Sequence, residues 1–453
     1  MKIWDELKGK YVEFNNMNET LRIYVCGPTV YDTPHLGHLK TYIVYDSIVK
    51  YLRHRGFSVF YIQNITDIDD KIINRALETG EDPMVLSRKF TKEYMDVMKS
   101  VGIDSVSFYA RATLSINDII RGIRSLEKKG FTYRLPDGIY FRVWMDKEYG
   151  ALSHQISEKQ VAGKRAQVSD LKEDPRDFVL WKFQKEGEPS WNSPWGPGRP
   201  GWHIEDTSII MRYLGRSFHI HGAGADLKFP HNESEFSLIR SVKGNSNACR
   251  AWTYSGIIKI NGEKMSKSLN NGISARELLE KYSTEEIRYA FLSVNYRSEL
   301  DFTWKMLDDS REAVSYLKRA EASLRNMEPG KQRIHVEQYK KTFYNYLEED
   351  FNSRMALITL NELASEIFKS SNLSQEDIDN AANLFSAARD VFGILPEDED
   401  SSLSSATVEK LLDLRKDLRE RKMYEQSDAI RDALFQSHVV IEDKGGKVVW
   451  HRR

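Results

Sequence analysis

The sequence has little cysteine, almost no net charge and no long apolar run. Among 453 residues the only cysteines are Cys26 and Cys249, which excludes a disulfide framework and a zinc finger built from paired cysteines. The 66 basic and 67 acidic residues leave a net charge of −1, so any contact with nucleic acid must use local patches. No stretch of about 18 apolar residues occurs, and the first residues lack the apolar core of a signal peptide. We therefore expect a cytoplasmic protein with no membrane contact.

Apolar material is nevertheless plentiful. Hydrophobic residues make up 40% of the chain, with 22 Tyr, 20 Phe and 9 Trp, which is enough for several buried cores. The length of 453 residues is about three times that of a typical domain. The composition and length together predict a chain of several folded domains.

The pattern of residues 21–66 predicts a βαβ unit. Residues 21–26 read as a buried strand that ends in a Gly-Pro loop, residues 39–56 carry apolar residues at helical spacing, and residues 58–66 read as a second strand. A right-handed crossover would place the loop after the first strand at the carboxyl edge of a parallel sheet, where ligands bind. His35 and His38 lie between this loop and the helix.

The rest of the chain predicts an interrupted second half and a helical end. Residues 71–129 look helical, and a stretch at 187–201 is rich in Pro and Trp. This middle portion of the chain has the character of an insertion. Residues 217–226, 230–242 and 255–262 then read as strand, helix and strand, so the two α/β halves could share one sheet. The last part has a simple expected order: helices from 273 to 392 with a break at Pro329-Gly330, an acidic linker at 396–407, two amphipathic helices, and a hairpin turning at Gly445-Gly446.

Two short motifs have the chemistry of a nucleotide site. HLGH at 35–38 would place two imidazoles at the start of a helix, where backbone N–H groups and the helix dipole favour phosphate. KMSKS at 264–268 puts Lys264 and Lys267 on a loop after a strand, where their charges would stabilise a departing pyrophosphate. A pair of histidines alone is weak evidence, but five specified residues rarely match by chance. The two motifs together resemble the signatures of class I aminoacyl-tRNA synthetases.

Longer segments resemble the cysteinyl-tRNA synthetase family from about residue 21 to Trp450. They include YVCGPTVYDTPHLGHLKTYIVYD, NITDIDDKI, GEPSWNSPWGPGRPGWHIE, HIHGAGADLKFPH and INGEKMSKSLNN, in the family's order. The resemblance implies an α/β fold with a Rossmann-type parallel-sheet catalytic domain at 1–270, containing a connective insertion at about 100–200. It further implies a helical stem-contact region at 271–330, a helical domain at 331–395 and an anticodon-binding tail at 408–453.

The resemblance also implies an activity. A member of this family is a ligase that uses ATP with Mg²⁺ to convert cysteine to cysteinyl-adenylate and then transfers the cysteinyl group to the 3′ end of tRNA(Cys). We expect a monomer. By the same resemblance the residues with roles are the following: catalytic, His35, His38, Lys264 and Lys267; ATP-binding, His35, His38, Gly222, Gly224, Asp226 and Lys267; amino-acid-binding, Cys26, Gly27, Thr29, Thr66 and Trp202.

The metal site is where the sequence departs from the family. Family members hold zinc with two cysteines, a histidine and a glutamate, and the matching positions here are Cys26, Asp206, His231 and Glu235. His231 and Glu235 are four residues apart, so on a helix both would project from one face. Asp206 keeps the formal charge of the thiolate that it replaces and is an accepted zinc ligand, but it makes the site harder. We expect one zinc ion per chain.

Smaller departures leave other functions open. The resemblance places histidine where this chain has Asn232 and Asn295, and glycine where it has Ala223. One alternative is a related ligase that joins cysteine to an amine other than tRNA, but such enzymes lack the anticodon-binding tail. Another is a non-catalytic paralogue, against which the intact HLGH and KMSKS motifs argue.

Overall fold

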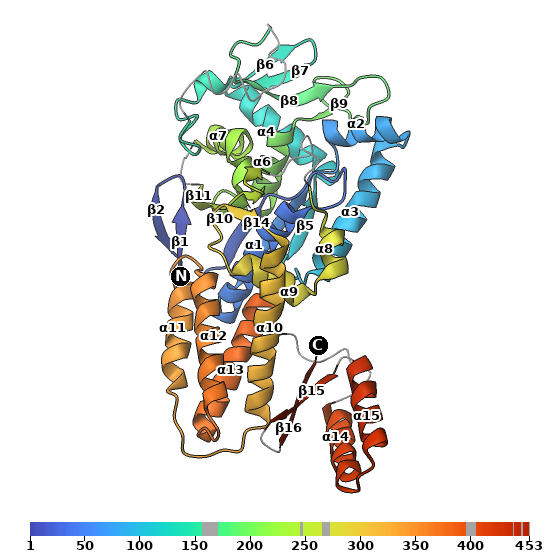
Figure 1. Ribbon diagram of the computed structural model, residues 1–453. Coiled ribbons are helices and arrows are strands. Elements are labelled where there is room, and N and C mark those ends of the chain that lie inside the picture. The colour runs from blue at the N-terminus through green and yellow to red at the C-terminus, as the bar shows by residue number, and fades with distance from the viewer. Residues whose placement is uncertain are drawn as a thin grey trace. The chain divides into compact units, whose positions relative to one another are not determined.

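The computed structural model describes residues 1–155, 171–244, 248–264, 272–395, 405–437, 439–444 and 447–452 (Figure 1). The chain forms two compact units. The first unit comprises Met1–Lys281, Asn295–Phe302 and Glu349–Phe351. The second comprises Tyr282–Val294, Thr303–Glu348 and Asn352–Arg453.

A five-stranded parallel sheet forms the centre of the first unit. Its order is β11-β10-β3-β4-β5, and every neighbouring pair is parallel. The strands are β3 (Leu21–Val25), β4 (Val59–Ile65), β5 (Phe108–Arg111), β10 (Phe218–Gly224) and β11 (Cys249–Ser255). The expected pairing of the two α/β halves is confirmed, because β10 lies beside β3. The strand order reverses between these two strands, and such a switch point opens a ligand-binding crevice at the carboxyl ends.

Three helices pack on this sheet and carry the site. Helix α1 (Leu36–His54) contacts β10 and β11 through Tyr45, whose hydroxyl donates to the carbonyl of Thr253 at 2.8 Å. Helices α6 (Trp202–Tyr213) and α7 (Glu233–Lys243) share a buried apolar cluster with β3 and β4. The expected helix at 39–56 is confirmed with a start three residues earlier, because the imidazole of His35 caps the first turn.

Some strands differ from expectation. The segment 71–129 contains helices α2 (Asp70–Thr79), α3 (Pro83–Ser100) and α4 (Ile116–Lys128), but β5 interrupts them. Strand β11 was not anticipated.

The strand expected at 255–262 is present only as β12 (Ile258–Ile260), which lies outside the central sheet. It pairs with β13 (Glu263–Lys264) and β14 (Leu300–Phe302). The chain leaves the central sheet because Gly256 turns to pair its N–H with the carbonyl of Tyr296 at 2.7 Å.

Two further sheets lie in the first unit. Strands β1 (Lys2–Asp5) and β2 (Lys10–Glu13) form an antiparallel pair. The region expected to be an insertion contains an antiparallel sheet of β6 (Thr132–Leu135), β7 (Gly138–Phe141), β8 (Phe178–Phe183) and β9 (Gly198–Pro200). Phe141, Trp181 and Ile119 of α4 share its apolar core. Helix α8 (Ala275–Lys281) completes this unit.

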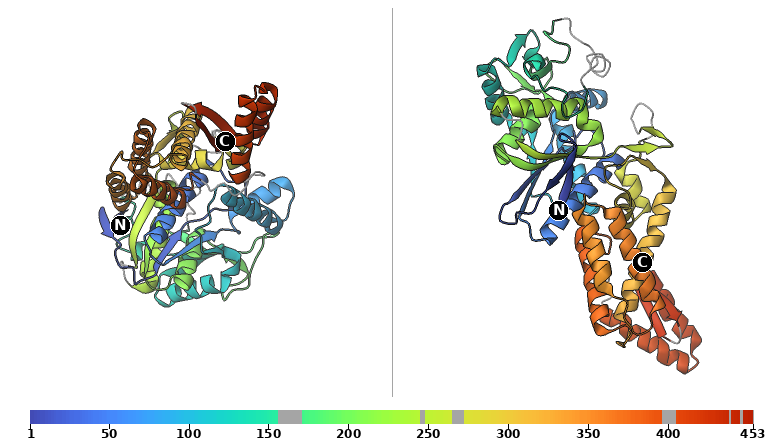
Figure 2. Two further views of the ribbon diagram at one scale, coloured as in Figure 1. Left: turned by 90° about the horizontal axis from the view of Figure 1, so that it is seen from below. Right: turned by 90° about the vertical axis from the view of Figure 1, so that its left-hand side faces the viewer.

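The second unit is mainly helical. Helices α12 and α13 each pack against both α10 and α11, and the four form one helical body in Figures 1 and 2. The bounds are α9 (Thr284–Leu292), α10 (Trp304–Arg325), α11 (Val336–Glu348), α12 (Ser353–Lys369), α13 (Gln375–Phe392), α14 (Ser405–Glu420), α15 (Tyr424–Gln436), β15 (Val439–Lys444) and β16 (Lys447–Arg452).

The last two helices and the hairpin have a small core of their own, around Val408, Leu434, Val439 and Trp450. The expected turn at Gly445-Gly446 and most of the expected linker lie outside the described residues.

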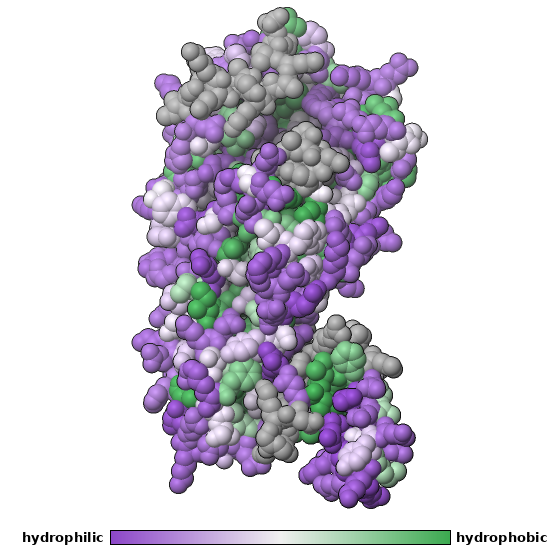
Figure 3. All heavy atoms as spheres, viewed as in Figure 1, coloured by the Kyte–Doolittle hydropathy of each residue, from purple (hydrophilic) through white to green (hydrophobic). Residues whose placement is uncertain are grey.

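The surface is mainly polar. Figure 3 shows hydrophilic residues over most of one face and hydrophobic ones in small separate areas. Within the described ranges, no helix combines the length and the apolar content that a membrane crossing requires.

Candidate active site and metal centre

A pocket of about 230 Å³ lies at the carboxyl ends of the central strands. It is lined by residues from the loop after β3, from the start of α1 and from the segments after β10 and β11. The expected site residues among its lining are Cys26, Gly27, Thr29, His35, His38, Trp202, Gly224 and Asp226. The structure thus brings these expected residues, but not the whole expected set, to one cavity.

His35 and His38 form one wall of this pocket. Their imidazole rings stack with centroids 3.8 Å apart. Nδ1 of His35 accepts from the N–H of Gly37 at 3.1 Å, and Nδ1 of His38 accepts from the N–H of His35 at 3.3 Å. The two side chains therefore cap the helix that carries them, which fixes both rings beside the cavity.

The glycine-rich turn after β10 has two different roles. A Cβ at Gly222 would lie 2.5 Å from the ring of Tyr45, so this glycine allows α1 to approach the sheet and does not line the pocket. A Cβ at Gly224 would lie 2.6 Å from Oδ1 of Asp226, and both of these residues reach the pocket. Only the second half of the turn therefore borders the cavity.

The expected amino-acid residues lie close together. The backbones of Thr29 and Thr66 form an isolated bridge, and the N–H of Thr66 donates to the carbonyl of Pro28 at 3.1 Å. Thr66 is 1% exposed and is not one of the described residues that line the pocket. Trp202 stacks on His231 with ring centroids 4.0 Å apart. The indole thus joins the pocket to the cluster behind it.

The two lysines of KMSKS lie at or beyond the edge of the described residues. Lys264 is the last residue of β13, whose partner is β12. Lys267 lies outside the described residues. Their expected role therefore stays a prediction.

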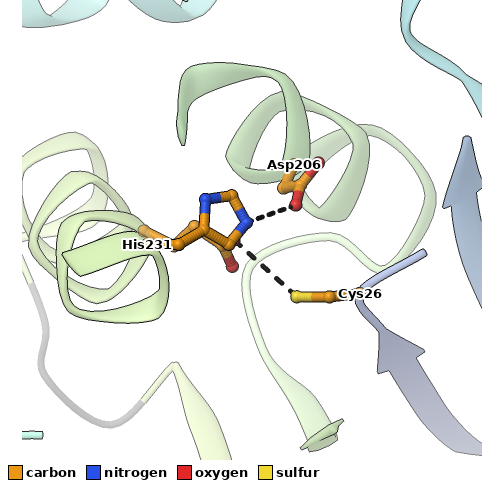
Figure 4. Close-up of side chains that lie close together, drawn as sticks. Cys26, Asp206 and His231 are labelled. Carbon is orange, nitrogen blue, oxygen red and sulfur yellow. Dashed lines mark hydrogen bonds and ion pairs between the residues drawn. The ribbon is translucent and has the colours of Figure 1, made fainter. Parts of the chain in front are cut away.

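Cys26, Asp206, His231 and Glu235 form a buried cluster. One ligand atom from each lies within 4.8 Å of the others. Nε2 of His231 lies 2.9 Å from Oδ2 of Asp206 and 2.5 Å from Oε1 of Glu235, and Sγ of Cys26 lies 3.8 Å from that same Oε1. Figure 4 shows the side chains of Cys26, Asp206 and His231 turned toward one another. The structure brings together all of the expected metal ligands.

Each ligand comes from a different part of the fold. Cys26 follows β3, and its N–H donates to the carbonyl of Gly222 at 2.9 Å. Asp206 is in α6. His231 lies in the irregular turn Lys228–Asn232, and Glu235 lies in the first turn of α7. The expected pairing of His231 with Glu235 across one helical turn is present, although the helix begins only at Glu233.

Burial and mutual charge determine the protonation of the cluster. Burial and the carboxylates of Glu235 and Asp206 raise the pKa of the Cys26 thiol well above its ordinary value. Burial and the charge of Glu235 raise the pKa of Asp206 to about 7. Burial opposes the charged form of His231, but the two carboxylates outweigh it and raise its pKa to about 10. Burial likewise opposes the charged form of Glu235, but His231 and His221 outweigh it and hold its pKa below the ordinary value.

The donor set fits a divalent cation. A thiol, an imidazole and two carboxylates converge, and buried carboxylates are costly unless positive charge compensates them. Zinc accepts sulfur, nitrogen and carboxylate oxygen ligands. Nδ1 of His221 and Oδ1 of Asn232, both buried beside the cluster, have no hydrogen-bond partner among the described residues. The cluster is therefore surrounded by buried polar atoms that the described side chains do not fully pair.

Three residues whose supporting roles were not predicted from the sequence contact these ligands. Nδ2 of Asn64 donates to Oδ1 of Asp206 at 2.7 Å, and Nδ2 of Asn232 donates to Sγ of Cys26 at 3.2 Å. Nε2 of His221 lies 2.7 Å from Oε2 of Glu235. Asn64 belongs to the strand end that meets the carboxyl edge of the sheet, a position that could have been noticed; nothing in the sequence indicates the partners of the other two.

Comparison with known proteins finds a matching family model and full-length relatives. The family model for the class I (C) catalytic domain of tRNA synthetases matches residues 13–312. The cysteine–tRNA ligase of Thermoplasma volcanium is 41% identical over 99% of this chain and 99% of its own length. That of Thermoplasma acidophilum is 41% identical over 99% and 100%, and that of Pyrococcus horikoshii 39% over 100% and 99%.

Solved structures show the same fold at low identity. The methionyl-tRNA synthetase of Mycobacterium tuberculosis in complex with methionyl-adenylate matches with a TM-score of 0.60 and 14% identity, over 82% of this chain and 89% of its own. A leucyl-tRNA synthetase ternary complex from Agrobacterium radiobacter matches with a TM-score of 0.60 and 10% identity, over 86% and 85%. Given the full-length identity to the curated relatives and the catalytic-domain match, the chain belongs to the cysteine–tRNA ligase family of class I tRNA synthetases.

Proposed function

We propose that this chain activates cysteine with ATP and transfers the cysteinyl group to the 3′ end of tRNA(Cys). The observation that carries the proposal is that Cys26 belongs both to the buried ligand cluster and to the lining of the pocket walled by His35 and His38. The proposed thiol-recognising centre therefore borders the proposed nucleotide pocket at Cys26. The full-length identity to cysteine–tRNA ligases supports the same reaction.

We assign the cluster of Cys26, Asp206, His231 and Glu235 to one zinc ion per chain. When bound, zinc supplies a soft Lewis acid that binds a thiolate strongly and an alcohol weakly. A shaped pocket alone discriminates poorly between near-isosteres such as cysteine and serine. Asp206 keeps the charge of the ligand set, and Trp202 packs on His231 at the pocket side of the cluster.

The remaining residues act on the nucleotide. In the activation step the carboxylate of cysteine attacks the α-phosphorus of ATP, and pyrophosphate leaves with its Mg²⁺. His35 and His38 stand at the helix start, where they stabilise the α-phosphate in the transition state of adenylyl transfer. Gly224 and Asp226 receive the adenosine side, with room for the nucleotide and a carboxylate for the ribose. Lys264 and Lys267 stabilise the leaving pyrophosphate.

The tail at 408–453 supports tRNA as the acceptor of the cysteinyl group. Its two helices and hairpin form a small cored module, which a ligase for a small amine would not need. We assign it to the anticodon region of tRNA, with the chain acting as a monomer in the cytoplasm. This feature favours tRNA over the alternative acceptor.

The experiment separates the two steps. The intact chain is compared with a variant lacking residues 408–453 in cysteine-dependent ATP–pyrophosphate exchange and in charging of tRNA(Cys). We expect the truncated variant to keep adenylate formation and to lose most of the transfer to tRNA. An intact chain that exchanges pyrophosphate with cysteine but never charges tRNA(Cys) would contradict the proposed function.

A further inference from the structure

Asn64 connects two of the ligand-bearing segments. It lies near the end of β4 and is 1% exposed. Its Nδ2 donates to Oδ1 of Asp206 at 2.7 Å, and its Oδ1 accepts from the N–H of Gly27 at 2.5 Å. Gly27 directly follows Cys26. One amide side chain therefore holds the helix that carries Asp206 and the loop that carries Cys26.

We propose that Asn64 is the positioning residue that makes Asp206 a ligand through a single oxygen. The proposal rests on the metal site proposed above and deepens it. An aspartate offers two carboxylate oxygens, whereas the thiolate that the family uses at this position offers one atom. The amide of Asn64 takes one oxygen of Asp206, so that the other is presented to the cluster.

Hydrogen-bond chemistry fixes the direction of this amide. The backbone N–H of Gly27 can only donate, so the oxygen of Asn64 must face it. The NH₂ group of Asn64 then faces Asp206, which accepts through Oδ1. Oδ2 of Asp206 is left to lie 2.9 Å from Nε2 of His231, inside the cluster. The two hydrogen-bond partners of Asn64 thus fix the orientation of its amide, because a flipped amide would face the N–H of Gly27 with its own NH₂ group.

The backbone around Asn64 reinforces the same contact. Nδ2 of Asn64 also lies 3.3 Å from Oγ1 of Thr66. A Cβ at Gly27 would lie only 1.7 Å from the backbone oxygen of Asn64, so the loop after β3 rests directly on β4. The amide is therefore held at both ends and cannot move away without separating the loop from the strand. Such supporting partners orient metal ligands and raise their affinity.

The test measures zinc affinity of the full-length chain by competition with a chelator. We expect Asn64→Ala to weaken zinc binding about 10- to 100-fold, as is typical when a residue that orients a ligand is lost. Gln63→Ala is the matched control. It removes a buried amide from the adjacent position of the same strand. This amide accepts from the hydroxyl of Tyr94 at 2.8 Å and, among the described residues, has no hydrogen bond to Asp206. We expect this control to bind zinc as the parent does.

A double-mutant cycle isolates the link to Asp206. In the Asp206→Cys background the sulfur has no second oxygen to be held, so Asn64→Ala should cost much less zinc affinity. We expect the two losses to differ by about tenfold or more, within the coupling range of residues in direct contact. Asn64→Asp is the second variant in case the alanine variant does not fold. It keeps the shape but faces Asp206 with an oxygen, and should weaken zinc at least as much.

The outcomes separate this inference from the proposed function. Parent-like zinc affinity in a folded Asn64→Ala, or an equal loss in the Asp206→Cys background, overturns the positioning role even if the parent charges tRNA(Cys). A parent that binds zinc in an Asn64-dependent way but does not activate cysteine leaves the positioning role standing and overturns the function. A parent that binds no zinc overturns the positioning role.

Discussion

Oδ2 of Asp206 faces Nε2 of His231 at 2.9 Å, with both side chains almost fully buried. This pair places a hard oxygen donor beside the imidazole, where the resemblance to the family implies a thiolate. The carboxylate keeps the formal charge of the thiolate, and one ligand atom from each of the four residues lies within 4.8 Å of the others. The chain therefore replaces sulfur by oxygen without dispersing the ligand set.

The Asp206 site allows a direct test of this replacement. Asp206→Cys restores a soft donor at the same formal charge, so we expect zinc to be retained or bound more tightly. Asp206→Ala leaves three ligands, so zinc and cysteine affinity should fall together. Elemental analysis and chelator competition measure the metal, and the Michaelis constant for cysteine measures the substrate. An alanine variant with full zinc content and unchanged cysteine affinity would remove Asp206 from the ligand set.

Metal binding should release protons. The pKa of His231 is raised to about 10 and that of the Cys26 thiol lies well above its ordinary value, so both are protonated at pH 7 in the metal-free chain. Ligation requires a thiolate and a neutral imidazole. Because the pKa of Asp206 is raised to about 7, this carboxyl is also partly protonated, so we expect about two to three protons to be released per zinc at pH 7 and the affinity to fall as the pH falls. Calorimetry in buffers of different ionisation enthalpy counts these protons, and a count near zero would contradict this protonation of the cluster.

The loop after β3 should not tolerate a side chain at Gly27. An alanine Cβ would lie 1.7 Å from the backbone oxygen of Asn64, and neither backbone can yield without parting the loop from β4. We expect Gly27→Ala to lower the free energy of unfolding by about 1–3 kcal/mol, as overpacking does, and to weaken zinc binding. Gly272→Ala is the control, because its Cβ would meet no atom of the described part of the chain within 4 Å. Equal stability of the two variants in urea denaturation would show that the contact is not tight.

Local patterns predicted the parts of the fold that depend on short sequence distances. The βαβ unit follows from β-branched and apolar runs separated by Gly27 and Pro28, and the helix after His35 follows from 3.6-residue spacing. Strand β5 was missed because Phe108–Arg111 is a short edge strand between helices. The strand assigned at 255–262 leaves the central sheet because Gly256 pairs with Tyr296, a partner that no local pattern indicates.

The site residues likewise differ in how far the sequence could predict them. The ligand set was inferred from resemblance, since Cys26 and Asp206 are far apart in the sequence and neither spacing nor periodicity joins them. His231 and Glu235 could be paired from their spacing alone. The supporting roles of Asn64, His221 and Asn232 were not predicted, although Asn232 was noted as a departure from the family's histidine. Asparagine and histidine beside a strand or helix are common, and these roles appear only when the folded chain shows which atoms the side chains face.

Lys267→Ala tests the assignment of KMSKS. We expect the variant to lose about 2–4 kcal/mol of transition-state stabilisation, as for one preorganised electrostatic contact, while the fold stays intact. The loss should appear in the rate of cysteine-dependent pyrophosphate exchange, with a parent-like circular dichroism spectrum as the control for folding. A variant that activates cysteine as fast as the parent would show that this loop does not act on the pyrophosphate.

The most direct test of the metal's role in thiol recognition combines two values from one preparation: zinc per chain and the preference for cysteine over serine in ATP–pyrophosphate exchange. Chelator treatment followed by zinc addition should abolish and then restore the preference, because the buried cluster of Cys26, Asp206, His231 and Glu235 would bind the thiolate through the metal. We expect about one zinc per chain and a strong preference for cysteine. A metal-free chain that still prefers cysteine strongly would contradict this account and leave recognition to the pocket around Thr29, Thr66 and Trp202.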